Sequence, residues 1–187
     1  MVTNVQFTPG TLEVVTLAQA KKQLRLEASF NDEDDLIQSY IDAAVANAEN
    51  FIGGHIIPGD LVITYDKFES PVIFEAFPLK TITSVDYYAD EAEETLDSEK
   101  YALTKQSEKV YKLRFKEDTP TTDERFDAVT ITIACGFADD VIPKPIIQAV
   151  KMMVAQMYEY REDSFQNNVF NMTNSPAFAL LRPYKKY

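Results

Sequence analysis

The sequence predicts an α+β fold, with a helical core and a β-rich antiparallel insertion. Three observations predict it. Apolar residues recur at helical spacing over residues 36–52 and 146–161. From residue 60 the pattern changes to period two, in short runs of β-branched and aromatic residues separated by turn residues. Both helical stripes are wide, and because the strand block separates them in the sequence, we expect the two helices to pack against each other in space.

A short first helix is predicted over LAQAKKQLR, residues 17–25. Thr16 followed by Gln19 fits a capping box, in which the hydroxyl of the first residue accepts from a backbone N–H of the first turn. Leu17, Ala20 and Leu24 then fall near one face, which predicts that this face is buried.

The second helix begins with an acidic run and ends at Gly53. Asn31 or Asp32 is its predicted N-cap, and the carboxylates of residues 32–35 lie in or next to its first turn. There the helix dipole favours each of them by ~0.3–1 kcal/mol. A calcium loop would need a glycine at its sixth position and a distal glutamate, and this run has neither, so the acids are interpreted as the start of a helix. The predicted apolar stripe consists of Leu36, Ile37, Tyr40, Ile41, Ala44, Val45, Ala48 and Ile52.

Strand-like runs fill the middle of the chain, at residues 60–68, 71–77, 80–89, 101–105, 109–115 and 126–137. Turn residues such as Pro58-Gly59 and Thr119-Pro120 separate them. The acidic segment ADEAEETLDSEK, residues 89–100, has little apolar content, and we predict that it is a solvated loop between strands.

The chain returns to helix near residue 143, where Pro143 and Pro145 suit a first turn because a missing N–H costs nothing there. Ser175 before Pro176 is predicted to start a last short helix, PAFALL. We therefore expect a single domain, 1–187, with helical parts at 16–54 and 143–187 and the β-rich insertion at 60–137. The predicted stripe of the third main helix consists of Ile146, Ile147, Val150, Met153, Val154, Met157, Tyr158 and Arg161.

Composition excludes several classes of function. The net charge of −12 disfavours a basic surface that grips DNA. The N-terminal stretch lacks the basic and apolar regions of a signal peptide, and no apolar run approaches the length of a membrane span, so we expect a cytosolic protein without a membrane anchor. Cys135 is the single cysteine, which rules out a disulfide within the chain, and its strand-like surroundings predict a buried, inert thiol.

No motif predicts catalytic, cofactor-binding or metal-binding residues. His55 has neither a second histidine nor a nearby cysteine, so we interpret it as a residue that caps or packs at the helix exit. The glycines form no phosphate-binding loop. The 12 Phe and 10 Tyr, many near the C-terminus, exceed what one small core needs, which indicates an interface.

The ordered set of segments resembles the head-tail connector (adaptor or head-completion) family of tailed bacteriophages. The segments are LAQAKKQLRLEA, an acidic turn into DDLIQSYIDAAVANAENFIGG, a strand block, IPKPIIQAVKMMVAQMYEYRED and the closing ALLRPYKKY. The strand block is longer and more acidic than in the minimal all-helical connectors. The positions that correspond to the family pattern are Leu17, Leu24, Asp34, Asp35, Ala44, Glu49, Gly53, Pro143, Ala149, Tyr158, Arg161 and Glu162.

The resemblance implies a virion structural protein without enzymatic activity or cofactor. It implies a ring of about twelve copies between the portal protein and a tail-completion or stopper protein, with DNA passing through without specific binding. A negative channel wall would repel the phosphates of that DNA. Whether the isolated chain is monomeric is left open. The predicted oligomer or portal interface consists of Tyr158, Tyr160, Arg161, Phe178, Leu180, Leu181, Arg182, Tyr184, Lys185 and Lys186.

Two alternatives from other classes remain at this stage. A monomeric β-sheet-based module that binds a protein partner would stay monomeric at high concentration. A carboxylate-dependent hydrolase would bring acids together in a cleft with separated pKa values. The C-terminal segment 176–187 has two alternatives of its own, since it either docks on the portal or packs on its own subunit.

Overall fold

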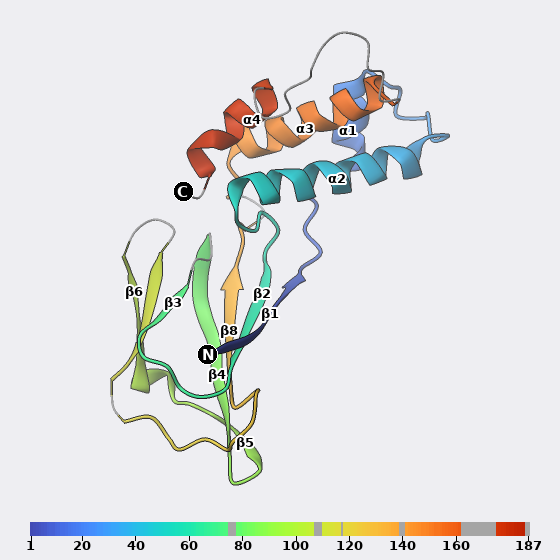
Figure 1. The fold of residues 1–187 in the computed structure, drawn as a ribbon. Coiled ribbons are helices and arrows are strands. Elements are labelled where there is room, and N and C mark those ends of the chain that lie inside the picture. The colour runs from blue at the N-terminus through green and yellow to red at the C-terminus, as the bar shows by residue number, and fades with distance from the viewer. Residues whose placement is uncertain (75–77, 107–109, 117, 139–140, 162–174, 186–187) are drawn as a thin grey trace. The chain divides into compact units, whose positions relative to one another are not determined.

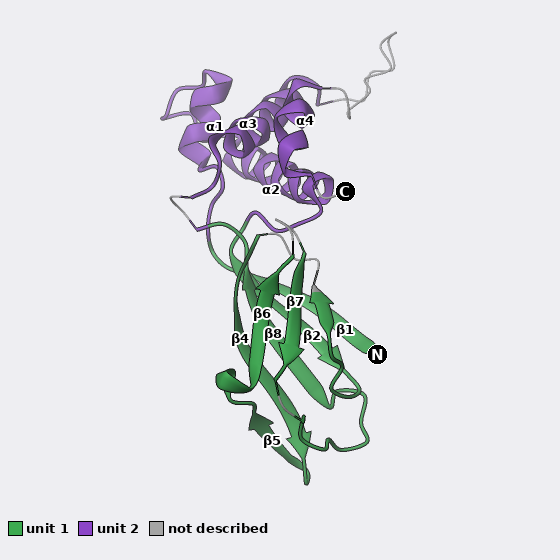
Figure 2. Ribbon diagram, turned by 90° about the vertical axis from the view of Figure 1, so that its left-hand side faces the viewer, with its two compact units in different colours: residues 1–11, 57–137 green, residues 12–56, 138–187 purple. Residues whose placement is uncertain are grey.

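The computed structural model describes residues 1–74, 78–106, 110–116, 118–138, 141–161 and 175–185 (Figure 1). Its class is α+β with antiparallel sheets, as predicted, and the described residues contain four α-helices. The chain divides into two compact units, drawn in different colours in Figure 2. The β unit consists of residues 1–11 and 57–137, and the helical unit consists of residues 12–56 and 138–187.

The helical unit contains α1 (Leu17–Leu24), α2 (Asp34–Ile52), α3 (Lys144–Glu159) and α4 (Pro176–Leu181), followed by a 3₁₀ turn, η3 (Arg182–Tyr184). The predicted caps of α1 and α4 are present, since Thr16 Oγ1 accepts from Gln19 N–H at 3.2 Å and Ser175 Oγ accepts from Phe178 N–H at 3.5 Å. Gly53 ends α2 with a φ of 71°, a left-handed conformation that glycine adopts without strain.

The core of the helical unit lies where α2 and α3 pack against each other, and α1 and α4 contact both of them. Six of the eight predicted stripe residues are buried on α2, but only four of eight on α3, where Ile147, Met157 and Tyr158 are half-buried and Arg161 is exposed. The buried side chains are Ile37, Ile41, Ala44, Val45, Ala48 and Ile52 on α2 and Ile146, Ala149, Val150, Met153 and Val154 on α3.

The β unit contains two antiparallel sheets that enclose a common core. The first sheet has the order β1-β2-β8-β4-β5, from β1 (Val2–Pro9), β2 (Gly59–Tyr65), β8 (Val129–Cys135), β4 (Leu79–Ala89) and β5 (Ala92–Thr95). The second has the order β3-β7-β6, from β3 (Val72–Phe74), β7 (Tyr111–Phe115) and β6 (Tyr101–Lys105), with a 3₁₀ turn, η1 (Ser98–Lys100), before β6. Cys135 is fully buried in the central strand β8, as predicted.

Two strands, β1 and β5, were not predicted. β1 pairs with β2 although it precedes the helices in the sequence, so the β unit is built from the N-terminus as well as from the insertion. Its run VTNVQFTP alternates too weakly in polarity to be recognised as a strand, since nearly all of it is exposed.

Residues 89–100 are largely solvent-exposed, as predicted, but the expectation that they form a loop is wrong. β4 continues to Ala89 and turns back through β5 as a two-residue hairpin, after which Leu96 enters the core. Backbone pairing with β4 holds β5, and such pairing needs no apolar side chains, which is why composition alone failed here.

The predicted N-cap of α2 is also wrong. Glu33 occupies that position and makes no capping bond, while Asn31 Oδ1 instead accepts from Lys21 Nζ at 3.0 Å. Of the acids in residues 32–35, Glu33 and Asp34 contact side chains outside the helix, those of Arg161 and Lys21.

Candidate assembly surfaces

Glu33 joins the start of α2 to the end of α3. Arg161 donates from Nη1 and Nη2 to the two oxygens of Glu33, each at 2.7 Å, and the Tyr158 hydroxyl donates to Oε2 at 2.5 Å. The Arg161 guanidinium also lies over the Tyr158 ring, 4.4 Å from its centroid. These hydrogen bonds, first from Arg161 and then from Tyr158, hold the pKa of Glu33 below its ordinary value. A paired, bidentate geometry of this kind fixes the two helix ends to each other.

Lys21 performs a similar role at the end of α1, although its side chain is buried. Its ammonium lies 2.6 Å from Asp34 Oδ1 in the first turn of α2 and donates to Asn31 in the loop between the helices. A buried ammonium without such partners would cost several kcal/mol, so the pair determines how α1 joins α2. The sequence indicates this buried contact of Lys21 only weakly, because a lysine near the end of a helix usually extends into solvent.

The C-terminal segment of the predicted interface packs on its own unit as far as it is described. α4 contacts α2 and α3, Leu181 is fully buried, and the Phe178 ring meets Phe51 of α2 edge to face with centroids 4.8 Å apart. Lys185 Nζ lies 5.0 Å from the centroid of the Phe51 ring. In this conformation Leu181 offers no surface to a partner.

The other predicted interface residues lie at or near the surface of the helical unit. Tyr160 and Arg182 are exposed, while Leu180, Tyr184 and Lys185 are half-buried. Tyr158 and Arg161 belong to the Glu33 contact described above. Lys186 lies outside the described residues. The segment thus presents a basic and aromatic surface on an acidic protein.

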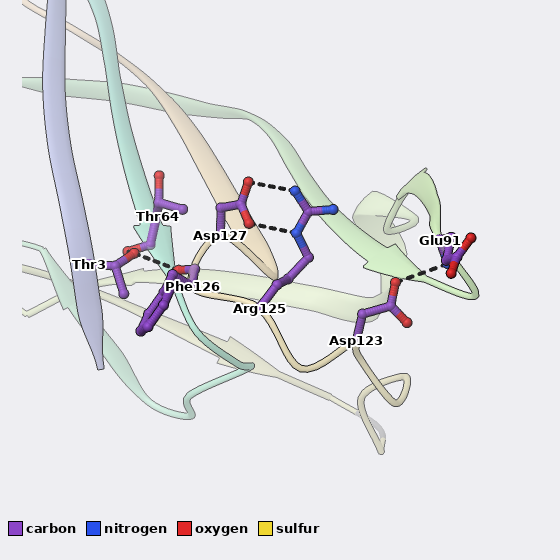
Figure 3. Close-up of polar contacts among 7 residues, drawn as sticks. All are labelled: Thr3, Thr64, Glu91, Asp123, Arg125, Phe126 and Asp127. Atoms are coloured by element: carbon purple, nitrogen blue, oxygen red, sulfur yellow. Dashed lines mark hydrogen bonds and ion pairs between the residues drawn. The ribbon is translucent and has the colours of Figure 1, made fainter.

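In the β unit, the side chain of Asp123 binds the backbone of the turn between β4 and β5. Its two carboxylate oxygens accept from the backbone N–H groups of Asp90, at 3.1 Å, and Glu91, at 3.0 Å. Both hairpin residues have positive φ, 52° and 61°, the combination of a two-residue type I′ turn. Figure 3 shows Asp123 directed toward this turn.

The loop that carries Asp123 is fixed at two further points (Figure 3). Arg125 donates from Nε and Nη2 to Asp127 at 2.5 and 2.7 Å, and its guanidinium stacks over the Tyr88 ring, 3.6 Å from the centroid. Thr3 Oγ1 of β1 donates to the Phe126 carbonyl at 2.8 Å. The backbone around Phe126 is therefore held in place while its side chain remains exposed.

Within the ranges that the structure describes, no group of three or more His, Cys, Asp or Glu side chains could hold a metal ion. Burial lowers the pKa of His55, although the charge of Glu49 opposes this shift. None of the described helices combines the length and apolar content needed to cross a membrane.

Comparison with known proteins decides the family. A family model described as phage gp6-like head-tail connector protein matches residues 14–121, which span α1 to β7. This chain belongs to that family. The expected resemblance is thereby confirmed, and the match includes most of the strand block that distinguishes the chain from the minimal all-helical connectors. No curated protein matches the chain in a sequence search.

Solved structures share the fold of this connector-family chain over nearly its full length. A chain in the neck of an empty GTA particle, computed with C6 symmetry, is 20% identical and superposes with a TM-score of 0.73, covering 97% of this chain and 96% of its own. A chain in the virion of the native gene transfer agent (GTA) particle is 20% identical, with the same coverage and a TM-score of 0.72. A chain in the neck of the native particle, computed with C12 symmetry, gives 18% identity, a TM-score of 0.70 and the same coverage.

Proposed function

We propose that this chain is a structural subunit of the neck of a phage-like particle, where copies form a closed ring between portal and tail. The main supporting observation is that 97% of this chain, including both units, has the fold of a chain in such a neck, while residues 14–121 match the connector family. The ring would complete the head after DNA packaging and continue the DNA channel.

Two observations support a ring around a DNA channel, and neither role requires enzymatic activity. The neck structures with similar chains were computed with C6 and C12 symmetry, which a closed ring of identical subunits satisfies. The net charge of −12 suits a channel through which DNA slides, because a negative wall repels phosphates. Particle assembly by a connector requires no bond chemistry.

We further propose that the basic and aromatic C-terminal surface contacts an acidic neighbour such as the portal. Arg182 and Lys185 supply cations and the adjacent Tyr184 an aromatic ring in an otherwise acidic protein, and Tyr160 at the end of α3 is also exposed. Such charge complementarity mainly increases the association rate and selects the partner. The two compact units would then serve one connector subunit, with the helical unit providing this contact.

The experiment is complementation of a strain from which the gene has been deleted. We expect the deletion to give DNA-filled heads without tails in electron micrographs, and wild-type protein expressed in trans to restore tailed particles. Tailed particles in the deletion strain would contradict the proposed function. Charge reversal at Arg182 and Lys185 should reduce restoration, whereas reversal of two exposed bases of the β unit, Lys105 and Arg114, should not.

A further inference from the structure

The two edges of the five-stranded sheet differ in how they are protected against pairing with another chain. Edge strands usually carry charges that prevent such pairing. β5, at one edge, is AEET, with two glutamates in four residues. β1, at the other edge, is VTNVQFTP, eight residues without a charged side chain in a chain with 48 charged residues, the 18 bases and 30 acids together. β1 therefore carries no charge that would oppose pairing, and the register shift between Val2 and Asn4 and the terminal Pro9 limit such pairing to the residues between them.

The apolar face of this sheet also continues uncovered onto β1. Val5 lies opposite Ile63, Ile63 opposite Ile131, and Ile131 opposite Val85, so one row of side chains crosses four strands on the same face. Exposure rises along that row from 0% at Val85 through 1% at Ile131 and 8% at Ile63 to 58% at Val5. The apolar face of this sheet is thus buried at its centre and exposed to solvent at the β1 edge.

Phe126 adds an exposed aromatic side chain next to this edge. Its side chain is 84% exposed, while Thr3 of β1 donates to its carbonyl at 2.8 Å and also to the Thr64 carbonyl at 3.1 Å. Figure 3 shows the Phe126 ring beside Thr3 and away from the Arg125–Asp127 pair that fixes the same loop. An aromatic ring on a backbone already fixed loses little entropy on binding, which is typical of residues that dominate an interface.

We infer that the β1 edge, with Val5 and Phe126, is one side of the contact between neighbouring copies of this chain, so that its occupant is a second copy. This inference rests on the proposed ring. In a closed ring each copy offers two different surfaces, one to each neighbour, and β1 supplies one of them. Copies of net charge −12 repel each other, and a charge-free edge brings them together without placing like charges in the contact.

The test compares full-length variants in the complementation experiment. Val5→Lys places a charge at the edge and Phe126→Ser removes the aromatic side chain. Because both positions are exposed, each variant should keep the wild-type melting temperature. Each should lower the yield of tailed particles about tenfold or more, because Val5→Lys places a charge in the contact and Phe126→Ser removes a large aromatic side chain from it. Ile73→Lys is the matched control, at an exposed position (56%) on the edge strand β3, and should restore tails like the wild type.

A photoreactive phenylalanine analogue at Phe126 identifies the occupant directly, independently of the stability of the variants. In assembled particles we expect a cross-linked species of twice the subunit mass that contains peptides of this chain only. A cross-link to a different particle protein, no cross-link, or full restoration of tails by both variants would overturn the inference. So would an equal loss with Ile73→Lys. If wild-type protein itself restores no tails, the proposed function fails instead, which separates the two failures.

Discussion

The helical unit and the β unit treat their apolar surface differently. In the helical unit the stripes of α2 and α3 cover each other, and polar contacts fasten the helix ends through Lys21 and Glu33. In the β unit the apolar face of the five-stranded sheet continues to the exposed Val5 of edge strand β1. Among the described residues, five of the seven large hydrophobic side chains that are exposed belong to the β unit: Met1, Val2, Val5, Ile73 and Phe126. The apolar stripes of the helical unit thus cover each other within one chain, whereas the β unit leaves more of its apolar side chains exposed.

The largest loss of stability should follow from a charge placed in the buried contact between α2 and α3. Met153→Asp places an unpaired carboxylate in the buried contact of α3, which should cost ~3–5 kcal/mol and unfold this unit. Thermal unfolding followed by circular dichroism at the helical signal is the measurement. Gln148→Asp, at an exposed position of the same helix, is the control and should change little. An unchanged melting temperature for Met153→Asp would mean that this face is not core.

Lys21→Ala should give the next largest loss. It removes a buried ammonium and leaves Asp34, whose side chain is 29% exposed, without that partner, which should cost about 2 kcal/mol after allowance for partial solvation. Denaturant unfolding of this variant and of Lys22→Ala, which changes the exposed neighbouring lysine, measures the difference. Equal free energies of unfolding for the two variants would show that the buried pair contributes nothing.

The contact of Glu33 predicts a pH dependence. Its pKa is lowered in the folded state, so its contribution to stability is present above the ordinary carboxyl pKa and is lost as the pH falls through the lowered value. Glu33→Gln should therefore lower the melting temperature at pH 7, by less than Lys21→Ala because the contact is partly solvated, and the difference from wild type should shrink in acid. A difference that stays constant between neutral and acidic pH would contradict this account.

Features that depend on residues close together in the sequence could be predicted from it. The helices, their stripes and the caps at Thr16 and Ser175 follow from spacing within a few residues, so they could be read locally. Strand β1 could not, because its partner lies about fifty residues away and its outward side chains mimic a loop. The partners of Glu33 could not be inferred either, since Arg161 follows it by 128 residues and only the fold brings them together.

Surface contacts were the hardest to predict, for the same reason. The sequence favoured the C-terminal segment as an interface because apolar residues and bases coincide there, but burial of Leu181 and the contact of Phe178 with Phe51 depend on the packing of α4. The exposure of Phe126 depends on three tertiary contacts of its loop. An exposed aromatic residue can be recognised only when its surroundings are known.

The smallest expected effect concerns the tip of the β4-β5 hairpin, at the protected edge of the sheet. Asp90 and Glu91 occupy the two central positions of a type I′ turn with φ of 52° and 61°, where a side chain is strained and glycine is not. Glu91→Gly should therefore raise the free energy of unfolding by about 0.5–1 kcal/mol, whereas Glu91→Ala keeps the strain and should leave it nearly unchanged. Asp123→Ala should lower it in both backgrounds, because the turn amides lose their acceptor. Denaturant unfolding of Glu91→Gly, of Glu91→Ala and of the two double variants that add Asp123→Ala measures these differences. A loss of stability in Glu91→Gly would mean that the flexibility gained by the unfolded chain outweighs the strain relieved in the folded turn.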